Sequence, residues 1–394
     1  MSRATENEHR NERRYVHAFT FGNFLIGTGV MLAPGLLMVL SSDLGTSVPQ
    51  TALLITVAAV AMCIGSPVLA TLTSRVDRRT VLASSLTLYA IGHALCAFAP
   101  SLTVLIVVRT ITLLGAAVFT PQAAATLGIV IAPERRAAAI TAVFLGWSVA
   151  SVAGSPLSAW LGAHLGWRQT FGLFAALCVL GVIWVLRVVP AGLHGTSLSR
   201  DAWRQVVKHP ALIAILVVTA VSASGQFTTF AYIAPFVAHT LDPSPNTLSL
   251  ALVLFGLAGV IGNVWATRRI GTAGPTSNVT LSLWSMCAGM LVLAAAGASW
   301  AGFVLGALAW GGGVFANNSS QQARLVAASP ALAGASIALN TSMIYLGQAI
   351  GTSLGGAVIA SSSYRTLPVV GAVVLLAALA LSWRAARKSI PGSS

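Results

Sequence analysis

Four charged residues that could form ion pairs lie in one short polar hairpin: Arg75, Asp77, Arg78 and Arg79. The apolar runs beside it, residues 51–72 and 80–99, are each about long enough to cross a bilayer, which takes about 20 residues. So short a connection makes the two helices antiparallel neighbours, and its arginines predict a cytoplasmic location. We interpret the hairpin as a gate whose charge–dipole and ion-pair contacts lock one conformation. A loop that only sets topology is the alternative.

Arg109 is the one charge that falls well within an apolar run, near the start of residues 102–131. A charged side chain at the centre of a bilayer costs at least about 2.5–3.5 kcal/mol, so a functional role is the default hypothesis. The alternative is a long side chain that reaches out to the nearer interface.

The apolar run over residues 137–162 has small residues at a spacing of four, Gly154 among them, and then Pro156. Small residues let helices approach closely, and proline removes a backbone hydrogen bond and favours a kink. We predict a helix that rocks against its partner. Plain close packing is the alternative, and both can hold together. A similar small-residue run contains Gly347 and Gly351.

Uncharged polar side chains within the apolar runs are candidates to bind a solute. For each of them, a hydrogen bond between helices is the alternative. The candidates are Asn23, Thr28, Thr120, Gln122, Gln226, Tyr232, Asn317, Gln321, Asn340 and Tyr345. Amides, hydroxyls and aromatic rings suit many neutral or weakly cationic compounds, so the sequence singles out no one substrate.

The carboxylates lie in tails, loops or the ends of apolar runs: Glu6, Glu8, Glu12, Asp43, Asp77, Glu134, Asp201 and Asp242. A proton relay through a membrane needs a titratable group there, and His93 is the one obvious substitute. A hydrogen-bonded packing residue is the alternative for His93. The four cysteines lie in apolar runs without CxxC spacing, so we expect no disulfide, no metal and no cofactor.

Composition predicts a membrane protein. Of 394 residues, 56% are hydrophobic and 8% are charged, whereas a soluble domain carries about 25% charged residues. The net charge of +14 comes from basic residues in short loops, where topology requires them, so no nucleic-acid partner is expected. The polar amino terminus lacks a signal-peptide pattern, so we expect an uncleaved chain.

Twelve apolar runs follow one another: 17–40, 51–72, 80–99, 102–131, 137–162, 168–189, 211–239, 247–267, 277–297, 300–323, 334–360 and 365–383. With the amino terminus inside, the interior segments hold 19 of the 22 Lys and Arg residues, and the exterior segments hold only Arg168 and Arg365. This asymmetry is the one that the positive-inside rule requires. It predicts twelve transmembrane helices with both termini in the cytoplasm.

The longest polar interruption divides the chain into two halves. The predicted limits are a cytoplasmic tail at 1–16, a six-helix bundle at 17–189, a cytoplasmic linker at 190–210, a second six-helix bundle at 211–384 and a tail at 385–394. Pro133 and Gly154 are 21 residues apart, as are Pro330 and Gly351. Repeated halves are common among transporters, so we predict an internal duplication.

Six segments, in order along the chain, resemble motifs of the major facilitator superfamily. The closest resemblance is to its bacterial drug:proton antiporter branch, which includes sugar, purine and chloramphenicol exporters. The segments are residues 27–30, 75–79, 109–117, 146–162, 166–171 and 225–236. The chain departs from the motifs at four positions. Ser74 replaces an aspartate, Asp77 a glycine, Thr112 a glutamine and Val30 an acidic residue.

The resemblance implies two six-helix bundles around a central cavity, alternating access, and export of a small molecule against an inward proton flow. Valine at position 30 agrees with the lack of carboxylates inside the apolar runs. This departure bears on proton coupling and leaves the prediction of transport unchanged. In this interpretation the hairpin charges gate the cytoplasmic side and Gly154 and Pro156 govern helix rocking. Arg109 couples ion and solute, and His93 is the substitute for the missing carboxylate.

We therefore expect an all-α membrane protein with twelve transmembrane helices in two pseudo-symmetric six-helix bundles, a monomer in the bacterial cytoplasmic membrane. We expect it to export a drug-like, sugar or nucleobase-like molecule, with the solute, protons and the lipid bilayer as its partners. An uncoupled or differently coupled facilitator, or an uptake transporter, is the alternative. A membrane enzyme would need clustered catalytic groups, and a channel is disfavoured by the repeat and by the lack of a filter motif.

Overall fold

A computed structural model describes residues 3–194 and 200–388. Those parts of the predicted tails and linker that lie at 1–2, 195–199 and 389–394 fall outside the described residues. Over the described ranges the chain forms fourteen α-helices and two short 3₁₀ turns, with no strand. The predicted all-α class is confirmed.

The first half contains six long helices, the second of which is preceded by one helical turn. They are α1 (Arg3–Asp43), α2 (Val48–Thr51) with α3 (Leu53–Leu72), α4 (Arg78–Ala97), α5 (Leu102–Val130), α6 (Pro133–Leu165) and α7 (Trp167–Val188). Capping side chains and proline set their starts: Asp77 caps α4, Ser101 caps α5, and Pro133 lies in the first turn of α6. α1 begins far upstream of its apolar run, so most of the segment predicted as a tail is helical.

The second half begins with a linker helix. Its elements are α8 (Arg200–Lys208), α9 (Pro210–Phe230), α10 (Ile233–Thr240), α11 (Pro245–Ala296), α12 (Trp300–Ala328), η1 (Pro330–Leu332), α13 (Ala333–Ser361), η2 (Tyr364–Thr366) and α14 (Leu367–Lys388). Within α11, Gly274 has φ 77° and ψ 158°, and Pro275 follows it. Glycine tolerates this positive φ, and proline disfavours a helical residue before it, so α11 is two helices joined at Gly274.

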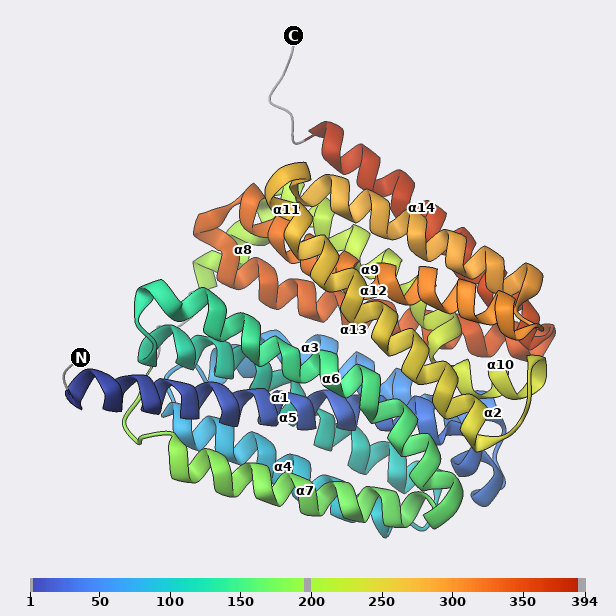
Figure 1. Cartoon of the computed structure of the whole chain (residues 1–394), viewed down its shortest axis with the longest axis horizontal. Helices are drawn as coiled ribbons and strands as arrows, with labels where there is room; N and C mark the ends of the chain where they lie inside the picture. Colours follow the sequence, from blue (N-terminus) through green and yellow to red (C-terminus); the bar gives the residue numbers. More distant parts are fainter. Residues whose placement is uncertain (1–2, 195–199, 389–394) are drawn as a thin grey trace.

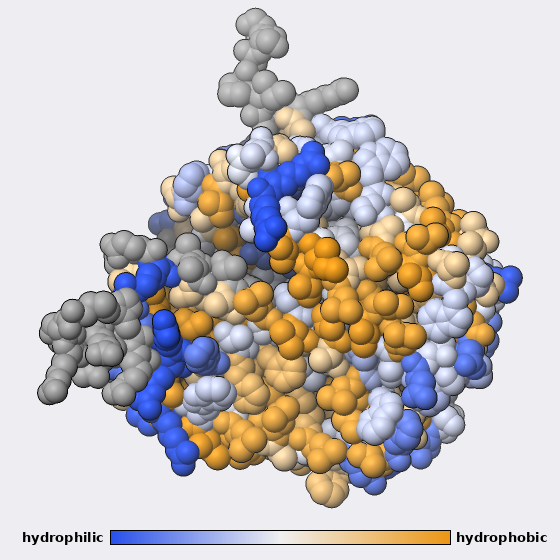
Figure 2. All heavy atoms as spheres, viewed as in Figure 1, coloured by the Kyte–Doolittle hydropathy of each residue, from blue (hydrophilic) through white to orange (hydrophobic). Residues whose placement is uncertain are grey.

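Nine helical stretches of the described residues are long and apolar enough to cross a membrane. Once α11 is divided at Gly274 and α6 and α12 are included, each of the twelve predicted runs has a long helix, although the run 211–239 is divided between α9 and α10. Large apolar side chains such as Ile64, Ile261 and Leu305 are more than half exposed. Figure 2 shows hydrophobic residues filling the middle of one face, with hydrophilic residues gathered at its edges. Lipid is the environment that suits such a surface.

The two halves form two layers (Figure 1). They meet mainly where α3 packs on α13 and where α6 packs on α11. This is the predicted arrangement of two six-helix bundles, although the residue limits given for them stay predictions. We call the end of the helices that carries residues 73–77 the hairpin end, and the end that carries Asp43 and residues 241–244 the Asp43 end.

Matching glycines pack matching helices in the two halves. A Cβ on Gly154 of α6 would lie 3.1 Å from the Cα of Thr28 on α1. A Cβ on Gly351 of α13 would lie 3.0 Å from the backbone nitrogen of Thr228 on α9. Both glycines let two helix backbones approach more closely than a larger residue allows. The repeat predicted from the proline–glycine spacing therefore has a counterpart in the packing.

Candidate functional site

The Asp77 carboxylate ties the hairpin to the segment that follows α7. Its Oδ2 accepts hydrogen bonds of 3.0 Å from both the backbone N–H and the hydroxyl of Thr80 at the start of α4. Its Oδ1 accepts from the backbone N–H groups of Gly192 at 2.7 Å and Leu193 at 3.0 Å. Partial burial raises the pKa of Asp77, but these hydrogen bonds outweigh it and hold the pKa below its usual value.

Arg78 joins the same hairpin to α5. Its buried guanidinium donates to Oε1 of Gln122, and Nε2 of Gln122 donates to the Thr73 hydroxyl at 2.9 Å. Among the described residues the contacts of the hairpin are hydrogen bonds, and its carboxylate forms no ion pair with its own arginines. Arg75 is exposed and Arg79 half-buried. The gating role of the four charges, and the solute-binding role of Gln122, stay predictions.

Arg109 points into the protein rather than out to an interface. Its side chain is 1% exposed, and Nη2 donates to the carbonyl oxygens of Gly29 at 3.0 Å and Val30 at 3.2 Å on α1. Nε and Nη1 have no acceptor among the described residues. The alternative in which this side chain reaches the surface is therefore wrong.

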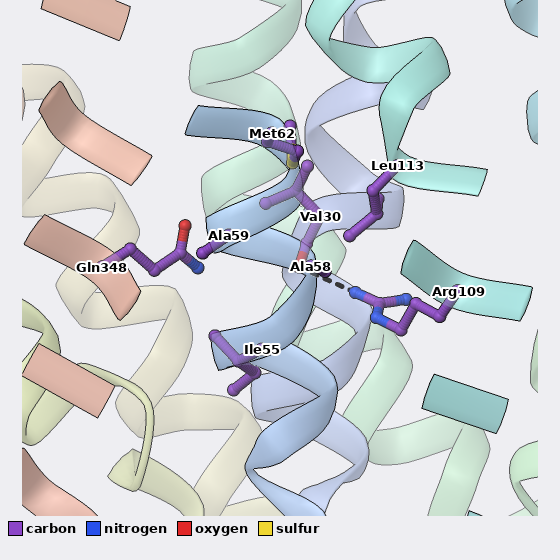
Figure 3. A pocket seen from close by; sticks show the side chains of 8 residues that line it. All are labelled: Val30, Ile55, Ala58, Ala59, Met62, Arg109, Leu113 and Gln348. Carbon is purple, nitrogen blue, oxygen red and sulfur yellow. Dashed lines mark hydrogen bonds between the residues drawn. The ribbon is translucent and has the colours of Figure 1, made fainter. Parts of the chain in front are cut away.

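A small cavity of about 10 Å³ lies beside this guanidinium (Figure 3). That is room for about one water molecule. Residues of α1, α3 and α5 in the first half line it together with Gln348 of α13 in the second half. The lining residues are Val30, Ile55, Ala58, Ala59, Met62, Arg109, Leu113 and Gln348. The cavity thus lies at the boundary between the two halves.

His93 lies elsewhere, in an aromatic cluster between α4 and α7. Its Nδ1 is 2.7 Å from the carbonyl oxygen of Tyr89, and its ring packs edge-on against Tyr89 and Phe174 at centroid distances of 4.5 and 4.7 Å. Its Nε2 has no partner among the described residues. This environment favours the packing alternative, and a relay role stays a prediction.

The polar candidates of the first half lie between helices. Nδ2 of Asn23 donates to the carbonyl of Val143 at 3.0 Å, and its Oδ1 accepts from the Thr120 hydroxyl at 2.5 Å. Asn23 therefore connects α1 with α5 and α6. Thr28, also buried, packs against Gly154 and its hydroxyl has no partner among the described residues.

In the second half, two of the predicted amides bind hydroxyls of α9, and a third lies one turn from one of them. The Thr219 hydroxyl donates to Oδ1 of Asn340 at 2.7 Å, and Nδ2 of Asn317 donates to the Ser222 hydroxyl at 3.2 Å. Gln321, one turn beyond Asn317 on α12, is fully buried, and neither of its amide atoms has a partner among the described residues. Sequence reasoning missed the two hydroxyls, although a polar pair three residues apart in an apolar helix is a readable signal.

The other three candidates do not join these three amides through any hydrogen bond between described side chains. The Tyr232 hydroxyl donates to the carbonyl of Thr352 at 2.8 Å and so fastens the turn between α9 and α10 to α13. Gln226 is half-buried and Tyr345 is buried. Solute binding by these three residues stays a prediction.

The halves approach closely at the α6–α11 contact. A Cβ on Gly256 of α11 would lie 2.6 Å from the Cα of Val152 and 2.7 Å from the carbonyl oxygen of Ser151. The Ser249 hydroxyl donates to the carbonyl of Pro156 at 3.2 Å. Pro156 itself has no N–H, so the carbonyl of Val152 lacks its usual helical donor at this contact.

A groove of about 430 Å³ opens at the Asp43 end, between α1 and α6 on one side and residues 234–248 on the other. Two carboxylates line it, and both have partners. Asp43 accepts from the indole of Trp167 at 2.7 Å and forms an ion pair with Arg168 at 2.8 Å. Asp242 accepts from the Thr247 hydroxyl at 3.1 Å. These contacts leave both carboxylates in local structural roles.

The sequence profile described as Major Facilitator Superfamily matches residues 19–320. The chain belongs to this superfamily and is a multi-pass membrane transport protein. It is 29% identical over 374 residues to the inner membrane transport protein YdhP of Escherichia coli (strain K12), covering 94% of this chain and 95% of YdhP. It is 27% identical over 369 residues to the uncharacterized MFS-type transporter YtbD of Bacillus subtilis (strain 168), covering 91% and 93%.

Solved structures share the fold at low identity. A bacterial homolog of the human lysosomal transporter Spinster, inward-facing and unoccupied, matches with a TM-score of 0.76 at 16% identity over 98% of this chain and 99% of that one. The human organic anion transporter MFSD10 matches with a TM-score of 0.72 at 17% identity, over 94% and 99%. The predicted superfamily is confirmed, while the sides of the membrane on which the termini lie stay predictions.

Proposed function

We propose that this chain is a secondary transporter that exports a small polar solute by alternating access. The observation that carries the proposal is the set of buried amide atoms without a partner among the described residues, on Asn317, Gln321 and Asn340. A buried amide without a partner is costly, so native interiors rarely retain one without a role. These amides offer donors and acceptors from α12 and α13, which suits a solute with hydroxyl, amide or ring-nitrogen groups.

The contacts between the halves support alternating access. They are close just inside the groove at the Asp43 end, where Gly256 meets Val152 and Ser249 meets Pro156. At the hairpin end, the strong contacts of the hairpin are made with α5 and with residues 192–193, all before α8. Rocking of the halves against each other at α3–α13 and α6–α11 would open the Asp43 end without breaking the hairpin. We propose that the hairpin end faces the cytoplasm.

A second candidate is a facilitator or an uptake transporter that uses no proton gradient. The observation that favours it is the position of the described carboxylates, of which Asp43, Asp77 and Asp242 lie at helix ends or in loops. An intramembrane titratable carboxylate is what proton transfer ordinarily requires. The direction of transport and its dependence on a proton gradient therefore have to be measured separately.

The experiment is accumulation of fluorescent drugs, labelled sugars and labelled nucleobases in efflux-deficient bacteria that express the chain, with and without a protonophore. We expect at least one solute to accumulate less than in cells without the chain. Gln321→Leu, which keeps the size but removes the amide, should reduce that difference by about 5–150-fold, as a loss of about 1–3 kcal/mol gives. Increased accumulation of every responsive solute would instead establish uptake.

A further inference from the structure

The charge of Arg109 has no counter-charge within the described part of the chain. The ion pairs found there join Arg135 to Glu12 and Arg168 to Asp43, and neither reaches Arg109. Two backbone carbonyls bind one of its terminal nitrogens, which leaves the N–H groups on Nε and Nη1 without acceptors. A guanidinium stays protonated in proteins, so Arg109 cannot become neutral by losing a proton. A buried charge left uncompensated is strongly destabilising.

The geometry around Arg109 suits one small anion. In Figure 3 the guanidinium and the amide of Gln348 point toward α3 from opposite sides, across the small side chains of Ala58 and Ala59. No carboxylate lines the cavity, so no full negative charge there opposes an anion. Its apolar walls strengthen any charge–charge attraction because they exclude water. The room for about one water molecule is close to what a chloride ion or a single carboxylate oxygen needs.

We propose that the cavity beside Arg109 binds one monovalent anion, which supplies the counter-charge that the described residues do not provide. The anion is either a free inorganic ion such as chloride or the carboxylate group of the transported solute. The second source rests on the function proposed above. Since the cavity has walls from both halves, an anion in it contacts both and favours the conformation in which they meet. Anion binding would then be coupled to alternating access in a chain that has valine rather than an acidic residue at position 30.

The test measures thermal unfolding of the full-length chain in nanodiscs of uncharged lipid. The sodium salt of a bulky sulfonate buffer serves as reference, and chloride or acetate replaces it at constant ionic strength. At about ten times the dissociation constant, we expect the wild-type Tm to rise by about 1–3 °C. Arg109→Gln should abolish this rise. Arg168→Gln is the matched control and should keep it, because Arg168 is exposed at the Asp43 end.

Val30→Asp is the second variant, and it does not depend on how Arg109→Gln folds. Residue 30 lines the same cavity, and its carbonyl already accepts from Arg109. A carboxylate there provides the counter-charge within the chain, so the variant should fold and lose its response to chloride and acetate.

The two anions separate the two sources. A rise with chloride identifies a free inorganic ion, and a rise with acetate alone identifies a carboxylate-bearing solute. No rise in the wild type with either anion overturns the proposal, and so does a rise that survives in both Arg109→Gln and Val30→Asp. Binding is measured here without transport, so a failure to find export in cells would overturn the proposed function and leave this result standing.

Discussion

At the scale of single residues, the Asp77 carboxylate determines whether the hairpin and residues 192–193 stay together. Its pKa in the folded chain lies below the usual 3.8, so the deprotonated form contributes stability above that pH. The contribution is lost as pH falls through and below 3.8. We expect hydrogen exchange at the amides of Gly192 and Leu193, corrected for its intrinsic pH dependence, to accelerate between pH 6 and pH 3, by at most about sevenfold.

In Asp77→Asn the same two amides should exchange faster at pH 6 and show no further change on acidification. Asp242→Asn is the matched control, because its partners Ser244 and Thr247 lie within five residues of it, at the start of α11. Equal protection of residues 192–193 in wild type and Asp77→Asn would show that the carboxylate does not hold the hairpin.

The sequence was informative about which charges matter and silent about their partners. Only 8% of the residues are charged, so three arginines in one short hairpin and one inside an apolar run are easily recognised in the sequence. The amide that Asp77 binds lies 115 residues further along the chain, and the carbonyl that Arg109 binds lies 80 residues earlier. Contacts at such separations depend on how helices pack, which hydropathy does not encode.

At the scale of helices, Gly256 permits a close approach of the two halves. A Cβ there would overlap backbone atoms of Ser151 and Val152 on α6, which cannot rotate away as a side chain can. Gly256→Ala should therefore push α11 away from α6, at a cost of about 1–3 kcal/mol to this conformation. We expect transport to slow by about 5–150-fold, measured as initial efflux rate at equal expression.

The control is Gly172→Ala on α7, where a Cβ would meet nothing within 4 Å. It makes the same substitution in another transmembrane helix, and transport should not change. Wild-type rates in Gly256→Ala would mean that the α6–α11 contact does not limit the cycle.

Helices were the best predicted level, because twelve long apolar runs leave few other ways to satisfy backbone hydrogen bonds in lipid. The internal repeat was predicted because the spacing of Pro133 and Gly154 recurs at Pro330 and Gly351. In the structure, Gly154 and Gly351 pack matching helices of the two halves. The helical start of α1 at Arg3 was not anticipated, because charged residues outside the membrane carry no hydropathy signal. Gly256 was also missed, since glycines are frequent in these helices and only the fold shows which one meets a backbone.

At the scale of the whole molecule, alternating access requires the Asp43 end to open and close in every cycle. Pro49 of α2 and Gly356 of α13 lie across this end, in different halves, and a Cβ on Gly356 would be 3.6 Å from the Cβ of Pro49. That separation is within the range of Cβ–Cβ distances in disulfides, about 3.5–4.5 Å. Oxidation of Pro49→Cys/Gly356→Cys should therefore link the two halves.

We expect the linked protein to lose transport almost completely and to recover it on reduction, because a covalent bond holds the Asp43 end shut. Each single cysteine variant controls for the substitution alone, and native Cys96, Cys178 and Cys287 are buried away from the oxidant. The link should also form more slowly when Gly256→Ala is added, since that change separates the same two halves. Full transport by a quantitatively linked protein would contradict alternating access through this end, and the path of the solute would then have to lie within one half.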